Sequence, residues 1–127
     1  MPIVSISLNR KILKEIDTMQ HEMGFSGRSE TIRAAVRMML ADRREKDDLR
    51  GFIDATLMVI HDEKYVESVS KIWHDHQELI KTQVHNHLEN NKCLEIFVLK
   101  GDAKRIKRMV DDFHINRNLD YVKLIVS

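Results

Sequence analysis

One short strand followed by two helices opens this chain, and that combination constrains the fold more than any other feature. Residues 3–8 alternate in polarity, so apolar side chains face one way and small side chains the other. The apolar face carries Val4, Ile6 and Leu8, and the opposite face carries Ile3, Ser5 and Ser7. A single strand cannot form a sheet, and about 45 residues cannot build an adequate core alone. We therefore expect two copies whose strands pair antiparallel across a twofold axis, with four helices packed beneath them.

Two helical patterns follow this strand. Asn9 is a good N-cap and Gly24 is typical of a helix end, so together they bound the first helix. The second helix is expected to begin at Ser29 or just before it. The apolar stripes consist of Ile12, Leu13, Ile16 and Met19 in the first helix and of Ile32, Ala35, Val36, Met39 and Leu40 in the second. Residues 41–50 are almost all charged, which predicts a helix end running into a solvated linker.

The rest of the chain alternates strand and helix patterns. We predict strands at residues 52–60, 82–88, 93–99 and 119–126, a helix at residues 62–79, and another helix capped by Gly101-Asp102. Asn90-Asn91 predicts a hairpin turn. The order βαββαβ is that of the ferredoxin-like fold. The chain is therefore expected to be an α+β protein with two domains, residues 1–48 and 51–127.

Composition excludes some classes of protein and leaves others open. The chain has 127 residues and a net charge of +1, so bulk charge alone does not suggest DNA as a partner. No apolar run approaches the roughly 20 residues that span a bilayer, and the first ten residues lack the apolar core of a signal peptide. We therefore expect a cytoplasmic protein with no membrane partner. The single cysteine excludes a disulfide within the chain.

Histidine and cysteine gather in one part of the second domain. His85 and His87 are two residues apart on a predicted strand, so both imidazoles project from one face. Cys93 begins the next strand, just past the hairpin turn. Two imidazoles and a thiolate can therefore converge on one metal ion. Glu95 is expected either to hold a ligand in place or to be a solvated strand residue, and His61 is expected to begin the helix before the ligand region.

The first domain resembles the ribbon-helix-helix family of repressors. The resemblance is carried by Gly24–Arg33, which reads GFSGRSETIR and matches the second-helix signature of that family. It implies that the paired strands enter the major groove of double-stranded operator DNA with Ile3, Ser5 and Ser7 facing the bases. It also implies that the start of the second helix, with Arg28 and Ser29, grips a phosphate. The alternatives are an ordinary small helical domain and a ribbon-helix-helix antitoxin without a ligand.

The whole chain resembles the nickel-responsive regulators of the NikR family. The resemblance rests on two segments: His85–Glu95, which reads HNHLENNKCLE, and Val98–Gly101, which reads VLKG. The resemblance implies a DNA-binding repressor in which ribbon-helix-helix dimers flank a central tetramer of ACT-type domains. It implies a four-coordinate, square-planar Ni(II) site formed by His85, His87 and Cys93 of one chain and His74 of another. It further implies that Lys64 meets a DNA phosphate when the metal orders the helix that follows Asp62.

The sequence departs from the family pattern at several positions. Ile3 stands where the family commonly has arginine, Ala34 where it often has aspartate, and Trp73 where glutamine is common. The stretch between His61 and His74 is one residue shorter than in the family. A regulator that responds to another metal, or to a small molecule through the ACT-type domain, therefore stays as an alternative. An enzyme is disfavoured because no motif supplies a substrate pocket.

Overall fold

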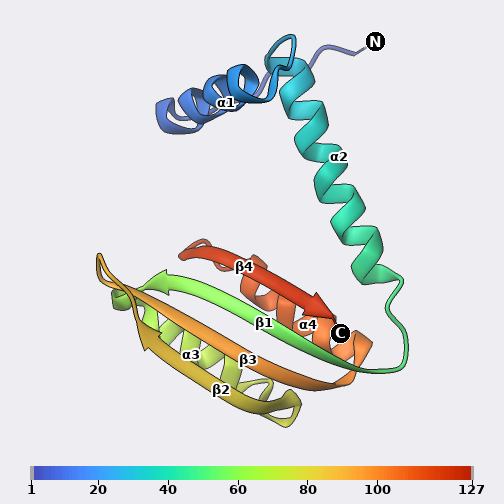
Figure 1. The fold of residues 1–127 in the computed structure, drawn as a ribbon, viewed down its shortest axis with the longest axis vertical. Helices are drawn as coiled ribbons and strands as arrows, with labels where there is room; N and C mark the ends of the chain where they lie inside the picture. Colours follow the sequence, from blue (N-terminus) through green and yellow to red (C-terminus); the bar gives the residue numbers. More distant parts are fainter. Residues whose placement is uncertain (1, 127) are drawn as a thin grey trace. The chain divides into compact units, whose positions relative to one another are not determined.

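The chain divides into two compact units, Met1–Lys46 and Asp47–Ser127. The computed structural model describes residues 2–126, and its elements are drawn in Figure 1. Among these residues, no helix combines the length and the apolar character that crossing a membrane requires.

The first unit contains helices α1 (Arg10–Met23) and α2 (Arg28–Asp47). The predicted caps of α1 are present: the side chain of Asn9 accepts a hydrogen bond from the backbone N of Ile12 at 2.8 Å, and Gly24 ends the helix with φ +75°. The charged run after Ala41 was expected to leave the helix, but α2 continues to Asp47. It contains no glycine or proline, and Lys46 pairs with Asp42 one turn earlier at 2.8 Å.

Residues 3–8 form no strand in the single chain, contrary to the sequence-based expectation. A strand is held by hydrogen bonds to a neighbouring strand, and none lies beside this segment in one copy of the chain. Its apolar side chains are accordingly exposed, with 77% of Val4 and 63% of Ile6 accessible to solvent. The segment has the alternating pattern of a strand without the partner that would pair with it.

The second unit is a four-stranded antiparallel sheet covered by two helices (Figure 1). Its strands are β1 (Phe52–Asp62), β2 (Ile80–His87), β3 (Lys92–Asp102) and β4 (Leu119–Val126), in the spatial order β2-β3-β1-β4. Helices α3 (Val66–His74) and α4 (Ala103–His114) lie on one face of this sheet. This is the predicted βαββαβ order, so the α+β, ferredoxin-like expectation is confirmed for this unit.

The core of the second unit lies between the sheet and its helices. Alternate residues of β1 and β3 point into it, as do the apolar residues of α4. The fully buried members include Leu57, Val59, Phe97, Leu99, Ile106, Met109 and Phe113. The β2–β3 hairpin turns at Asn90 and Asn91, whose φ angles of +61° and +59° are those expected for an Asn-rich tight turn.

The segment between β1 and β2 is less regular than the single helix expected over residues 62–79. It consists of the 3-10 turn η1 (Glu63–Tyr65), helix α3, and the 3-10 turn η2 (Gln77–Leu79). Strand β1 runs on to Asp62, whose side chain accepts from the backbone N of Lys64 at 3.0 Å and thereby starts η1. At the other end, Leu79 is buried against Gly101: a Cβ on that glycine would lie 2.5 Å from Leu79 Cδ2.

Candidate metal centre

The register of the sheet brings the predicted ligands of the metal site to one place. In the antiparallel β2–β3 pair, His87 lies opposite Cys93 and His85 lies opposite Glu95. Residues two apart on a strand share a face, so all four side chains project toward the helix-covered side of the sheet. Strand β2 is at the edge of the sheet, so this cluster is reached from that edge.

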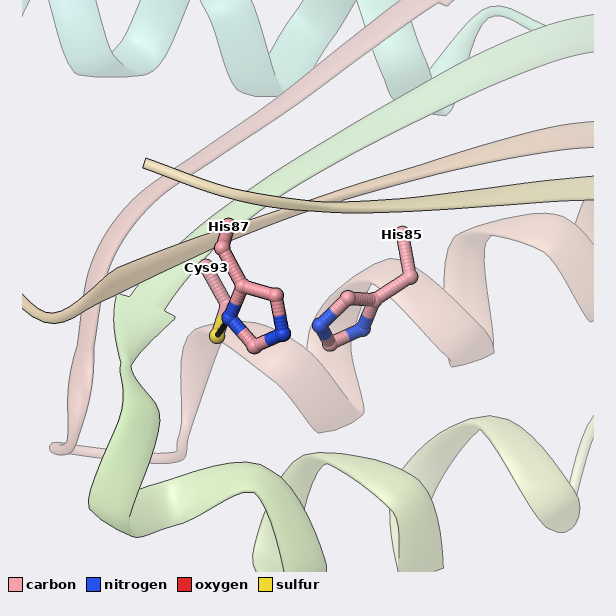
Figure 2. Close-up of side chains that lie close together, drawn as sticks. All are labelled: His85, His87 and Cys93. Carbon is pink, nitrogen blue, oxygen red and sulfur yellow. Dashed lines mark hydrogen bonds between the residues drawn. The ribbon is translucent and has the colours of Figure 1, made fainter. Parts of the chain in front are cut away.

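Three of the four residues offer donor atoms that converge (Figure 2). One ligand atom each of His85, His87 and Cys93 lies within 4.8 Å of the other two. The Sγ atom of Cys93 is 3.7 Å from Nδ1 of His87, and the two imidazole centroids are 5.2 Å apart. Cys93 is fully buried whereas both histidines are exposed. The group therefore has an inner sulfur donor and two outer nitrogen donors, which leaves room for a ligand from outside the cluster.

A buried carboxylate orients one of these histidines. Glu95 is 2% exposed, and its Oε1 lies 2.9 Å from Nδ1 of His85. With Nδ1–H donated to the carboxylate, the lone pair of His85 is on Nε2, which is the atom left for a metal. The expectation that Glu95 holds a ligand is therefore supported by its hydrogen bonds, and the alternative of a solvated strand residue is wrong.

The second oxygen of Glu95 is held by His61. Nε2 of His61 lies 2.8 Å from Glu95 Oε2, and its Nδ1 lies 2.8 Å from the backbone oxygen of Asp62. Both ring nitrogens thus lie within hydrogen-bond distance of oxygen atoms, which fixes the orientation of the His61 ring. His61 was expected to begin a helix, but it is the fully buried penultimate residue of β1 and lies opposite Cys93. It completes a chain of contacts from β1 through Glu95 to His85.

The thiol of Cys93 is held in its neutral form when no metal is bound. Burial raises the pKa of this thiol, and the carboxylates of Glu63, Glu95 and Asp62 raise it further. A metal ligand has to be the thiolate, so a cation that binds here displaces the proton of Cys93.

His74 lies outside this cluster in its own chain. It is the exposed last residue of α3, and its Nδ1 lies 2.7 Å from the backbone oxygen of Ser70. Its imidazole stacks on the ring of Trp73, with centroids 3.8 Å apart. The structure of one chain therefore brings together three of the four predicted ligands and leaves the fourth facing solvent.

His76 follows the predicted ligand His74 by two residues and lies outside the metal cluster. It is buried, and its Nε2 lies 2.7 Å from a carboxylate oxygen of Asp112 on α4. Glu78 pairs with Arg105 on the same helix. These contacts fasten the segment after His74 to α4, and they were missed because they join residues far apart in the sequence.

The predicted DNA-binding residues of the first unit are all exposed: Ile3, Ser5, Ser7, Arg28 and Ser29. Two details bear on the start of α2. The guanidinium of Arg28 makes two hydrogen bonds to Asp17 of α1, at 2.9 and 3.0 Å, which lower the pKa of that carboxyl. The carboxylate of Glu30 accepts hydrogen bonds from the backbone and the hydroxyl of Ser26. In the second unit, Lys64 is also exposed, with its Nζ 5.2 Å from the centroid of the Tyr65 ring.

Comparison with known proteins identifies the family. Residues 55–127 match the family described as the NikR C terminal nickel binding domain. The chain belongs to the NikR family. Residues 3–43 match the ribbon-helix-helix proteins of the copG family, so the fold expected for the first unit is confirmed at the level of family. NikR proteins are regulators, in agreement with the expectation that the chain is not an enzyme.

Relatives of similar length carry provisional names of the same kind. A protein of Methanococcus maripaludis (strain C5) and one of Methanocaldococcus jannaschii are each 34% identical over 99% of this chain and 92% of the relative, and both are provisionally named nickel-responsive regulators. A solved structure of an uncharacterized protein from Thermotoga maritima, 20% identical, matches with a TM-score of 0.56 over 60% of this chain and 98% of that chain. That structure supports the fold alone.

Proposed function

We propose that this NikR-family chain is a nickel-dependent repressor that binds double-stranded operator DNA in the cytoplasm and controls metal-uptake genes. The observation that carries the proposal is the convergence of donor atoms from His85, His87 and Cys93 at the edge of the sheet. Residues 1–48 form the DNA-binding domain in this proposal, and residues 51–127 bind the metal and hold the assembly together.

The donor set fits nickel. Imidazole nitrogen and thiolate sulfur are ligands of the soft-to-borderline kind that Ni(II) accepts, and the buried carboxylate behind His85 is the support that metal-bound histidines usually have. His85, His87 and Cys93 of one chain would hold Ni(II) together with His74 of a second copy. Bound there, Ni(II) would supply a cross-link between chains.

The DNA-binding part of the proposal rests on the first unit. Its exposed apolar residues fit a second copy, which would pair the two segments of residues 3–8 into one ribbon. Ser5 and Ser7 would then face the base edges in the major groove, beside Ile3, while Arg28 and Ser29 would lie near the phosphates. Arg28 would have to exchange its contact with Asp17 for a phosphate oxygen.

The mechanism is a shift between arrangements of a homotetramer, a dimer of dimers. A metal shared between chains binds best to the arrangement that brings both sets of ligands together, so it raises the population of that arrangement. If the same arrangement spaces the two DNA-binding dimers for two half-sites, nickel tightens operator binding. Operator must then tighten nickel binding by the same factor, because linkage between two ligands is reciprocal.

The decisive experiment measures metal and DNA binding by the full chain. Ni(II) titration is expected to give about one ion per chain and a thiolate-to-nickel charge-transfer band, which Cys93→Ala abolishes. His21→Ala is the matched control, because it removes an exposed imidazole from α1. Tight binding that persists in Cys93→Ala contradicts the assigned site.

A mixing experiment tests whether His74 comes from another copy. His74→Ala and Cys93→Ala chains each lack one ligand, so their separate assemblies bind nickel weakly. Mixed assemblies should regain some complete sites if the ligands come from different chains. No recovery in verified mixed tetramers contradicts a shared site.

The identity of the effector is tested with DNA selected from a random-sequence pool. Affinity for the selected fragment is compared without metal and with Ni(II), Zn(II), Cu(II) or Co(II). The proposal requires the largest increase with Ni(II). A larger increase with another ion identifies a regulator of that metal, and equal affinities in every condition contradict a metal switch.

A further inference from the structure

The two aromatic residues at the end of α3 form a stacked pair. The centroids of Trp73 and His74 are 3.8 Å apart, and their planes are inclined by 23°. Neighbouring side chains on a helix normally point about 100° apart, so contact between them requires the last helical residue to turn its ring onto the preceding one. His74 is that last residue.

A hydrogen bond to the backbone restricts the rotation of the His74 ring. Its Nδ1 lies 2.7 Å from the backbone oxygen of Ser70, one turn earlier, and 3.1 Å from the Ser70 hydroxyl. Because a carbonyl oxygen only accepts, Nδ1 carries the proton and the lone pair is on Nε2. His74 therefore presents Nε2, from an exposed position, as a metal donor.

The Trp73 ring is itself packed against the hydrophobic core of the second unit. Its ring lies 6.5 Å from that of Phe97, which is fully buried on β3, and Trp73 packs against the core together with Ile72. The stacking surface under His74 is thus fixed to the sheet and not only to α3. A ring held on one face by an anchored indole and at Nδ1 by a carbonyl has few orientations left.

We propose that Trp73 is a positioning residue that orients His74, with Nε2 exposed, before any metal binds. This inference rests on the proposed function only in naming a metal as what His74 meets. Fixing the donor in advance removes the rotamer entropy that metal binding would otherwise cost, so it favours affinity without adding a contact to the metal.

The first test uses metal-free protein. Trp73 is the only tryptophan of the chain, so its ring current marks whatever lies on its face. The ring protons of His74, assigned by their loss in His74→Ala, should resonate upfield of those of the exposed His21. Trp73→Ala should move them to the position of an exposed histidine, whereas Trp73→Phe should preserve part of the upfield shift.

Ile72→Ala is the matched control for the packing of α3. Ile72 packs on the same core, whereas the contacts that hold the His74 ring, as described above, are with Trp73 and Ser70. This variant is expected to leave the His74 shifts nearly unchanged. Unshifted His74 protons in the wild type, or equal effects of Ile72→Ala and Trp73→Ala, overturn the proposal.

The second test measures Ni(II) affinity in the same variants. Trp73→Ala should weaken binding roughly two- to tenfold, the range expected for one aromatic contact, and Trp73→Phe should recover most of that loss. Wild-type affinity in Trp73→Ala overturns the proposal. If the wild type binds no nickel, the proposed function fails, while the metal-free spectra still decide whether Trp73 orients His74.

Discussion

The two units of the chain differ in how far a single copy completes them. The second unit has a dozen buried residues in one hydrophobic core, while in the described part of the first unit the only buried residue is Thr31. The apolar side chains of the first unit are instead exposed, among them Val4, Ile6 and Met39. Burial of apolar surface is the main stabilising contribution to folding. The second unit buries its apolar side chains within one chain, whereas the first unit needs another surface to cover them.

The polar sites differ in the same way. The metal cluster is already assembled in one chain, with a buried thiol and a carboxylate that orients a histidine. The candidate DNA-reading residues lie on a segment that has no partner strand. This difference teaches that the two proposed functions need a second copy for different reasons: the DNA-binding surface needs it to exist, and the metal site needs it only for its last ligand.

The largest expected effect comes from breaking the first unit. Ile6→Asp puts a charge where the proposed two-copy core would bury an apolar side chain. Each buried isoleucine contributes about 1.5–3 kcal/mol and two copies lose it, about 3–6 kcal/mol together, so DNA affinity should fall on the order of 100- to 10,000-fold. Fluorescence anisotropy with the selected DNA measures this loss. Nickel binding by the second unit should persist.

Ser7→Ala is the matched control for Ile6→Asp, because it alters the opposite face of the same segment. It should leave assembly intact and reduce only discrimination between DNA sequences, by about 1–3 kcal/mol. Ser5→Ala should behave alike. A fully active Ile6→Asp protein would show that the first unit does not need its apolar face covered.

The next effect concerns the support of the metal site. Glu95→Gln keeps an oxygen that can accept from His85 but removes the negative charge that makes this imidazole a stronger ligand, and it places an amide where a carboxylate faces His61. Loss of such a support typically costs about 10- to 100-fold in metal affinity, which isothermal titration with Ni(II) measures. Glu89→Gln, at an exposed position, is the control. Equal affinities for the two variants would mean that Glu95 only fills space.

The parts of this site that could be predicted are those decided by neighbours in the sequence. His85 and His87 share a face because strands have a period of two, and Asn90-Asn91 closes the hairpin that brings Cys93 opposite. His61 and Glu95 are 34 residues apart, and only the β1–β3 register brings them together. Local periodicity carries no information about that register, so His61 was assigned to a helix.

The same reason explains where the fold predicted from the sequence differs from the structure. The apolar spacing of Val66, Val69 and Ile72 predicts a helix correctly, but nothing in that spacing marks where it stops. The helix ends at His74 and the chain then turns because Leu79 packs onto Gly101 and His76 pairs with Asp112. The missing strand at residues 3–8 has the opposite cause: the pattern is present, and the partner strand that it lacks would come from a second copy in the proposed dimer.

A smaller effect on stability should follow from adding a methyl group at Gly101, where Leu79 leaves no space for it. Gly101→Ala places a Cβ against Leu79 and should destabilise the second unit by roughly 1–3 kcal/mol, the usual cost of overpacking. Thermal unfolding of the full chain measures it. Gly27→Ala is the control in the first unit, where a Cβ meets nothing within 4 Å. Leu79→Ala combined with Gly101→Ala should cost less than the sum of the two single changes, because the clash is gone.

The smallest effect tests whether only the first unit contacts DNA or whether the second unit contacts it as well. Lys64 belongs to the second unit, yet it is expected to touch a DNA phosphate in the nickel-bound assembly. Lys64→Ala should therefore weaken binding to all DNA sequences alike and reduce the slope of log affinity against log salt by about one. Lys81→Ala removes the same charge from exposed strand β2 and should leave the slope nearly unchanged. The difference between the two variants should also disappear without nickel, because only the metal-bound arrangement would bring Lys64 to the DNA. If Lys64→Ala and Lys81→Ala behave identically with nickel, phosphate contacts belong to the first unit alone, and the second unit acts on DNA only by setting the spacing of the dimers.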